Sequence, residues 1–144
     1  MALDSNRAAK WFVDTCRADA TLATILGGAD IFRDPIPRDV PLPAIAVGVQ
    51  DGGQRRGAIA KGPNTHTGTS VTIRSSIWDT DNYVKIEQAA DRLDVLFDGR
   101  AYEPFADGYM WACERLGDIP REHTEDDITW LGWDILWRVT VKAT

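Results

Sequence analysis

The sequence predicts an α+β fold, in which a mainly antiparallel sheet of about four strands is covered by two helices and interrupted by a long flexible loop. Three observations indicate this fold class. Apolar residues recur at helical spacing near the N-terminus and again in the middle of the chain. Elsewhere they alternate with polar residues, and turn-rich connections of the kind that join antiparallel strands separate these stretches. The length of 144 residues fits one core, so we expect residues 1–144 to form a single domain.

The first helix is expected over residues 5–26. Ser5 offers a capping hydroxyl, and a helical repeat then places three apolar residues on one face: Ala8, Phe12 and Cys16. Asp19 offers a second N-cap, which predicts a break in the helix near that residue. The pair Gly27-Gly28 supplies the left-handed conformation that commonly ends a helix.

An extended connector follows, because residues 31–43 contain four prolines that exclude a helix or a central strand. Residues 42–50 then alternate as a strand should. Residues 51–68 contain five glycines, a proline and no periodicity, so we expect a long loop there. Connections of that length are usually functional or disordered.

In the second half of the chain we expect three strands and one helix. The helix has the most regular pattern in the sequence. Residues 71–78 alternate as a strand, and residues 83–97 carry apolar side chains at steps of three and four, with Gly99 at the end. Residues 109–116 form a third predicted strand, and residues 117–127 an acidic connector. In the last strand, residues 128–142, one face holds the apolar side chains Trp133, Ile135, Trp137, Val139 and Val141. Gly132 is expected to mark a bulge in that strand.

Composition excludes several classes of protein. The net charge of −6 would repel phosphate, so a dedicated DNA-binding protein is not expected. Two cysteines, Cys16 and Cys113, are too few for a disulfide scaffold, and we expect reduced thiols in the cytoplasm. No apolar run is long enough for a signal peptide or a membrane span, so we expect synthesis in the cytosol and no membrane partner.

The search for catalytic chemistry gives one candidate. The glycines of residues 51–68 lack the lysine and hydroxyl of a phosphate-binding loop, and the cysteines and histidines lack zinc-ligand spacing. Within residues 122–127, Glu122, His123, Glu125 and Asp126 could bind Mg²⁺ or activate a water molecule. Consecutive charges in a turn are more often a solvated surface. We therefore expect no enzyme, no cofactor and no metal, and keep a small metal-dependent hydrolase as an alternative.

Tryptophans and charges indicate an oligomer instead. Three of the six tryptophans, Trp130, Trp133 and Trp137, fall within eight residues of one strand, more than a small core should hold, so a neighbouring subunit is expected to cover at least one.

Two connections carry opposite charge. In residues 51–68 the basic side chains Arg55, Arg56 and Lys61 outnumber a single aspartate. In residues 117–127 one arginine faces five carboxylates, Asp118, Glu122, Glu125, Asp126 and Asp127. Such surfaces could meet in a head-to-tail ring, with accidental charge on solvated loops as the alternative.

The pattern as a whole resembles the tail terminator, or tail completion, proteins of long-tailed bacteriophages. The matching segments are "ADATLATILGGADIF", "RDPIPRDVPLPAIAVGVQDGG", "TSVTIRSSIWD" and "DNYVKIEQAADRLDVLFDG", and the resemblance covers most of the chain. None of them is a catalytic motif. The segment from Gly108 to Thr144 fits the family only loosely.

The resemblance implies a minor tail protein of the virion, located in the tail or neck. Such proteins form a ring, commonly a hexamer, that caps the head-proximal end of the tail tube, stops tube polymerisation and provides the surface for head–tail joining. The implied partners are further copies of the chain, the tail tube protein and the head–tail connector, with DNA only as cargo passing through the lumen. We expect Arg55, Arg56 and Lys61 to contact such a partner. A head completion or connector protein of the neck is the nearest alternative.

Overall fold

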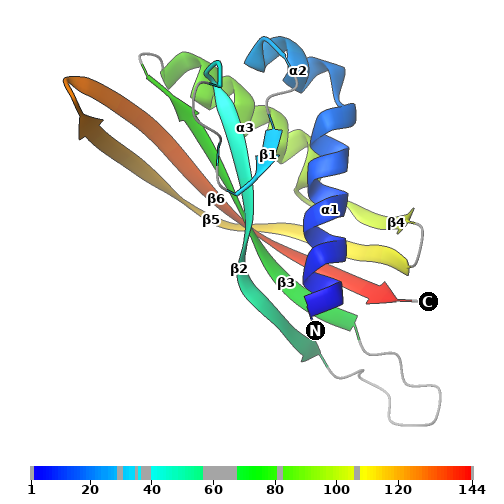
Figure 1. The fold of residues 1–144 in the computed structure, drawn as a ribbon. Coiled ribbons are helices and arrows are strands. Elements are labelled where there is room, and N and C mark those ends of the chain that lie inside the picture. The colour runs from blue at the N-terminus through cyan, green and yellow to red at the C-terminus, as the bar shows by residue number, and fades with distance from the viewer. Residues whose placement is uncertain are drawn as a thin grey trace, which may run out of the picture.

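The computed structural model describes residues 2–28, 31–34, 36, 40–56, 68–80, 83–105 and 108–143. Its sheet has six strands in the order β1-β2-β3-β6-β5-β4 and curls into a half-barrel (Figure 1). The strands are β1 (Ile31–Arg33), β2 (Ala44–Arg56), β3 (Gly68–Asp79), β4 (Ala101–Phe105), β5 (Gly108–Glu125) and β6 (Ile128–Ala143). Three helices complete the described part of the chain: α1 (Ala2–Ala18), α2 (Ala20–Leu26) and α3 (Tyr83–Phe97).

The predicted fold class is therefore wrong in three respects, the first being that the described residues form three helices rather than two. The sheet is mixed rather than purely antiparallel, because β1 pairs in parallel with β2, and it has six strands rather than about four. The prolines of the connector begin only at residue 35, which leaves Ile31–Arg33 free to pair at the sheet edge. Strand β4 also lies at an edge. Proline is tolerated there, because an edge strand has a neighbour on one side only and the missing N–H of Pro104 can face away from it.

The predicted helix break at Asp19 is confirmed. The Asp19 carboxylate accepts a hydrogen bond from the Leu22 backbone N–H at 2.9 Å and so caps α2. It also accepts two hydrogen bonds from the Arg92 guanidinium, at 2.7 and 2.8 Å, which tie α2 to α3. These contacts lower the pKa of Asp19, chiefly through the hydrogen bond from Arg92. Gly27 ends α2 with φ of +74°.

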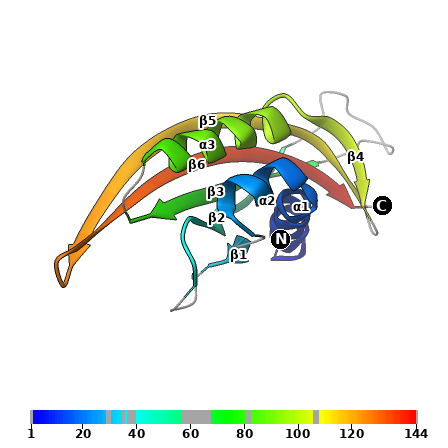
Figure 2. The same ribbon diagram turned by 90° about the horizontal axis from the view of Figure 1, so that it is seen from above.

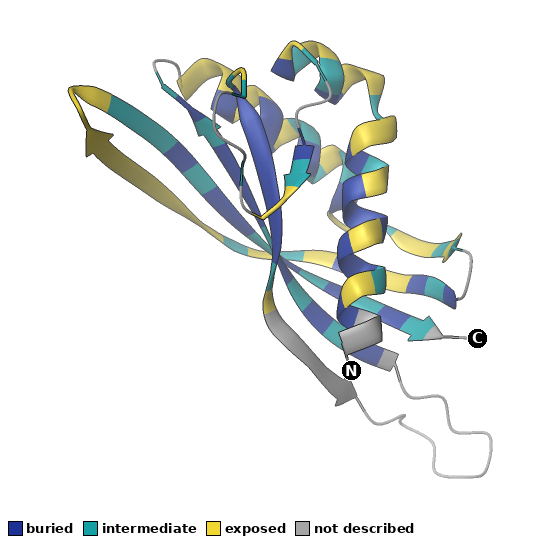
Figure 3. Cartoon of the chain, viewed as in Figure 1, coloured by how far each residue is buried: buried dark blue, intermediate teal, exposed yellow. Residues whose placement is uncertain are grey.

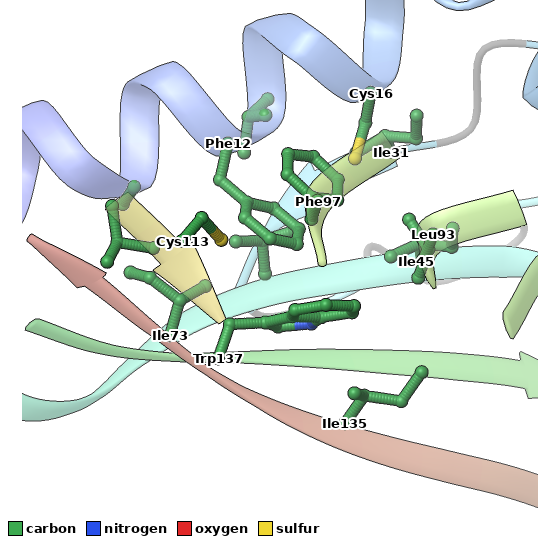
Figure 4. Packing of buried hydrophobic residues seen from close by; sticks show 14 of the residues in the cluster. Phe12, Cys16, Ile31, Ile45, Ile73, Leu93, Phe97, Cys113, Ile135 and Trp137 are labelled. Carbon is green, nitrogen blue, oxygen red and sulfur yellow. The ribbon is translucent and has the colours of Figure 1, made fainter. Parts of the chain in front are cut away.

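One hydrophobic core lies between the helices and one face of the sheet. Figure 3 shows the buried faces of α1 and α3 turned toward the strands. At its centre the rings of Phe12 and Phe97 stack with centroids 3.8 Å apart, and both lie within 6 Å of Trp137 (Figure 4). The indole Nε1 of Trp137 donates to Ser75 Oγ at 2.9 Å, so this large side chain is buried with its polar atom satisfied. The apolar face predicted for the last strand is confirmed by this core.

Strand β2 is longer than predicted. It continues to Arg56, and its last residues pair with the start of β3, Arg55 with Thr69 and Arg56 with Gly68. The predicted loop over residues 51–68 is therefore wrong at both ends. Two register shifts between Val49 and Gln54 absorb the glycines that made this segment look irregular in the sequence.

The predicted acidic connector over residues 117–127 is also wrong, because β5 runs through it to Glu125. Strands β5 and β6 form one long hairpin closed by Asp126 and Asp127, whose φ values are +50° and +63°. Two left-handed residues in a two-residue turn match the right-handed twist of the strands, and aspartate tolerates this conformation better than most residues. Figure 2 shows the hairpin bowing across the molecule to a tip that projects beyond the helices.

Gly132 marks no bulge. It pairs in register with Trp78 of β3, and a Cβ atom at this position would lie 2.6 Å from the Trp78 ring. The bulges of the hairpin lie in β5 instead, between Met110 and Ala112 and between Arg115 and Gly117. Glycine is thus needed at 132 to let the indole lie against the backbone.

Candidate interaction surfaces

Residues 117–131, which we call the arm, form the projecting end of the β5–β6 hairpin. Residues 118–128 are all exposed, including Ile119 at 51% and Ile128 at 46% of their accessible surface. The arm carries one arginine and five carboxylates, a net charge of −4. It exposes two isoleucines beside strong negative charge, and β3 pairs with β6 only as far as Leu131, so the hairpin beyond that residue is a two-stranded ribbon.

The arm does not assemble the predicted metal or acid/base site. Successive strand residues point to opposite faces of a ribbon, so Glu122 lies on the face away from His123 and Glu125. His123 Nε2 lies 3.4 Å from Glu125 Oε2, and both side chains are exposed. Asp126 sits in the turn. Across the described ranges of the chain, no group of three or more histidine, cysteine, aspartate or glutamate side chains is placed to hold a metal ion.

The structure separates the three tryptophans that were grouped as a candidate interface. Trp137 is fully buried in the core, which removes it from any subunit surface, because its bulky ring fills the space between the helices and the sheet. Trp133 is half-buried, and its Nε1 donates to Asp118 Oδ2 at 2.8 Å. Trp130 is half-buried on the face of the hairpin that the helices leave uncovered, since it alternates with Leu131 and Trp133. Only Trp130 and Trp133 remain available to a partner.

A cavity of about 660 Å³ lies between the root of the arm and the connector that follows β1. Trp78 and Trp130 line it together with Asp134, which is only 3% exposed. Asp134 Oδ2 pairs with Arg121 Nε at 2.5 Å, while Oδ1 has no hydrogen-bond partner within the described part of the chain. The cavity wall thus combines aromatic rings with charged side chains, among them Arg74 and Glu125 besides Asp134.

A groove of about 820 Å³ lies at the other end of the molecule, between α1, the end of α3 and β4. Its apolar lining includes Trp11, Leu96 and Phe105. Trp11 is almost fully buried, and its Nε1 has no acceptor among the residues that the structure describes. Basic side chains surround the groove: Arg7, Lys10 and Arg100. No periodic pattern in the sequence indicates this groove, because it forms only where a helix and an edge strand meet.

An exposed aromatic cluster occupies the β4–β5 edge. The rings of Tyr102 and Tyr109 stack with centroids 5.6 Å apart, and Trp111 lies 6.5 Å from each. Tyr102 is 70% exposed and has a φ of +61°, a conformation that costs energy for a residue other than glycine. Exposed tyrosine and tryptophan are enriched at protein interfaces. Sequence analysis missed this cluster because Tyr102 belongs to an edge strand that the sequence did not predict.

The basic residues predicted to contact a partner are only partly placed. Arg55 and Arg56 are the last two residues of β2, whereas Lys61 lies outside the described residues. Of the predicted loop contact, the structure thus describes only the backbone of Arg55 and Arg56, which pair with Thr69 and Gly68 of β3.

Both cysteines are free and buried, as expected for reduced thiols. Burial raises the pKa of each thiol, that of Cys113 to about 12. Neither is therefore a nucleophile at neutral pH. In the described parts of the chain, no helix has the length and apolar character needed to cross a membrane.

Comparison with solved structures shows a clear likeness in fold. The chain superimposes on a chain of the virion of a native gene transfer agent (GTA) particle with a TM-score of 0.71 and 17% sequence identity. The match covers 99% of this chain and 98% of that one, so the two share the fold from end to end. No protein-family model matches the sequence, and no curated protein sequence matches it significantly.

Proposed function

We propose that this protein is a structural component of a virion, and that it caps the head-proximal end of a phage tail tube as a ring of identical subunits. The observation that carries the proposal is the likeness in fold to a chain of a gene transfer agent virion over 99% of this chain and 98% of that one. The segments that resemble tail terminator proteins in sequence point in the same direction.

The surfaces of the chain support a role that depends on shape. A subunit that binds the end of a polymer but offers no site for the next tube subunit stops growth without any chemical step. The exposed aromatic cluster provides a contact surface of the composition found at protein interfaces. The acidic residues suggested for hydrolysis are divided between the two faces of the arm, so the hydrolase is not proposed.

The test is to delete the gene from the phage or prophage and image the particles by negative-stain electron microscopy. A cap that stops polymerisation predicts tails longer than normal and unattached to heads. Tails of normal length beside free heads would favour a connector protein of the neck instead. Complete particles of normal infectivity would contradict the proposal, and restoring the gene in trans is the control.

We also propose that Arg55, Arg56 and Lys61 contact an acidic surface of the tube or connector protein. Replacing all three with alanine is expected to leave the unfolding temperature unchanged but to reduce the fraction of tails joined to heads. The charge-conserving variant Arg55→Lys/Arg56→Lys should join tails normally. Normal joining by the alanine variant would show that these charges are not needed.

A further inference from the structure

Few strands of the chain hold the arm in place. Strand β3 pairs with β6 only as far as Leu131, and among the described residues no backbone pairs with the outer edge of β5 beyond Cys113. The end of the hairpin, residues 123–130, is therefore a two-stranded ribbon, a unit that is only marginally stable by itself in water. Its direction has to be set at its root, where residues 115–122 of β5 pair with residues 131–137 of β6.

A bulge at the root brings two charged side chains to the same face of the hairpin. Arg115 pairs with Trp137 and Asp118 with Ile135, so both lie on the face that carries the buried core side chains. Residues three apart in a regular strand point to opposite faces. The extra residue between Arg115 and Gly117 removes this difference.

The Arg115 guanidinium links α3 to the arm on this face. Its Nη1 donates to Asp94 Oδ2 of α3 at 2.5 Å, and its Nη2 donates to Asp118 Oδ2 of the arm at 2.9 Å. Trp133 Nε1 of β6 donates to the same Asp118 oxygen at 2.8 Å. A chain of hydrogen bonds to carboxylates thus runs from α3 through β5 to β6, and we call it the helix-side clamp.

A second clamp lies on the opposite face of the root. Arg121 Nε of β5 donates to Asp134 Oδ2 of β6 at 2.5 Å, and Asp134 is only 3% exposed. The Trp78 ring lies over Gly132, whose other neighbour in the sheet is Arg121. The ion pair and the ring therefore hold β3, β6 and β5 together side by side, and we call them the free-side clamp.

The two arginines are the ionic partners on which these carboxylates depend. Oδ1 of Asp94 and Oδ1 of Asp134 are buried and have no hydrogen-bond partner within the described ranges. Separating a buried ion pair leaves an uncompensated charge, so such a pair resists opening more than an exposed pair does. Because the clamps lie on opposite faces, a tilt of the ribbon toward either face stretches the clamp on the other.

We propose that the two clamps fix the direction of the arm in the free subunit, with Arg115 and Arg121 as positioning residues. A surface whose direction is set beforehand loses less conformational freedom when a partner binds it. The inference concerns the shape of the free subunit, so it goes beyond the proposed function and does not depend on it.

The test measures the spread of distances between the arm and α3 by pulsed electron paramagnetic resonance. Spin labels are attached at Ile128→Cys in the arm and Gln88→Cys on α3, both exposed positions, and the labelled subunit is diluted with unlabelled protein. The native cysteines are buried and are not labelled. We expect a narrow distribution of distances in the otherwise wild-type subunit.

The clamp variant is Asp94→Asn/Arg115→Ala/Arg121→Ala/Asp134→Asn, in which asparagine avoids a buried charge without a partner. Its distance distribution should be at least twice as wide as that of the wild type. The matched control, Glu114→Gln/Arg138→Ala, removes a 2.7 Å ion pair between the same two strands in the covered half of the hairpin. This control should leave the width unchanged.

A folding check accompanies the measurement. The amides of Cys113 and Val139, in the core, should still exchange slowly in the clamp variant. If they do not, Arg115→Lys/Arg121→Lys replaces it. This variant keeps both charges but loses the planar fork that binds a carboxylate through two nitrogens, and it should also be wider than the wild type.

Two outcomes would overturn the inference. One is a distribution that stays as narrow in the folded variant as in the wild type, and the other is a wild-type distribution as wide as that of the variant. Either outcome would leave the tail-capping function intact if deletion of the gene still produced overlong tails. Normal tails after deletion would remove that function and leave the clamps untouched.

Discussion

The two halves of the β5–β6 hairpin share one continuous ladder but differ in what covers them. In the base, residues 108–115 with 136–143, alternate side chains enter the core, among them Met110, Cys113 and Trp137. In the arm, residues 117–131, the same pairing continues without a helix above it, and the side chains of β5 are exposed on both faces. Since a ribbon gains stability when a further element covers one of its faces, we expect the two halves to differ in stability although their ladder is continuous.

The bulge between Arg115 and Gly117 marks the boundary between the halves. Arg115 is the last β5 residue linked to α3, through a 2.5 Å ion pair from its guanidinium to Asp94, and its backbone N–H donates to Asp98. Beyond it the hairpin leaves the helices. We expect the base to determine the stability of the subunit and the arm to determine its association.

The largest effect should come from the base. Trp137→Ala removes a fully buried ring from the centre of the core and is expected to cost about 3–5 kcal/mol in the free energy of unfolding. Trp130→Ala in the arm should cost less than about 1 kcal/mol, because that ring is half-exposed. Denaturation with urea measures both, and equal losses would contradict the division of the hairpin.

The next effect is expected at the root of the arm. Gly132→Val places side-chain atoms where the Trp78 ring lies, 2.6 Å from the first of them, and should cost about 1–3 kcal/mol. Gly117→Val is the control, because a Cβ there meets no atom within 4 Å. If the two variants unfold at the same urea concentration, the close packing of Trp78 on Gly132 is not important for stability.

A smaller effect should come from the link between α2 and α3. Asp19→Asn keeps a capping side chain but loses the charged contact with Arg92, which should cost about 1 kcal/mol at pH 7. The pKa of Asp19 is lower in the folded state than in the unfolded chain. The stabilisation from its charged form is therefore complete above the ordinary aspartate pKa of about 3.9, and it is lost as the pH falls through the folded-state pKa. The wild type and the variant should therefore converge in stability on acidification.

The control for that experiment is Asp14→Asn, which removes an exposed pair with Lys10 and should change stability by less than about 0.5 kcal/mol. The free energy of unfolding of Asp19→Asn and of the wild type should be compared down to about pH 2. A difference that stayed constant over this range would show that the ion pair with Arg92 is not its cause.

The smallest effect on the isolated subunit is expected in the arm. Ile128→Ser should change the free energy of unfolding by no more than about 0.5 kcal/mol, because the side chain is already half-exposed. The same variant should weaken association of the subunits, measured by sedimentation. A large loss of subunit stability would place Ile128 in the core rather than at an interface.

The same contrast explains what the sequence could and could not predict. Strand β6 and helix α3 were predictable because each buries one face, which imposes a period on the apolar residues. The arm half of β5 was interpreted as a connector because exposure on both faces removes that period and leaves only a run of charges. Asp126-Asp127 was a turn signal within that run, but without alternating neighbours it did not indicate a hairpin.

Edge strands and surfaces were harder to predict than the core. Strands β1 and β4 have three and five residues, too short for a pattern to emerge. The α1–β4 groove and the aromatic cluster depend on those edges and so could not be predicted. Trp137 was assigned to a candidate interface because the sequence does not show how much room the core has, and the half-barrel has room for it.

Hydrogen exchange of the free subunit and of the subunit in purified particles tests the account most directly. We predict that the amides of the base, such as those of Cys113 and Val139, exchange slowly in both states, whereas those of residues 118–128 exchange quickly in the free subunit and slowly in particles. Equal exchange rates of the arm amides in the free subunit and in particles would contradict the expected role of the arm in association. Absence of the chain from the particles would contradict the proposed virion function.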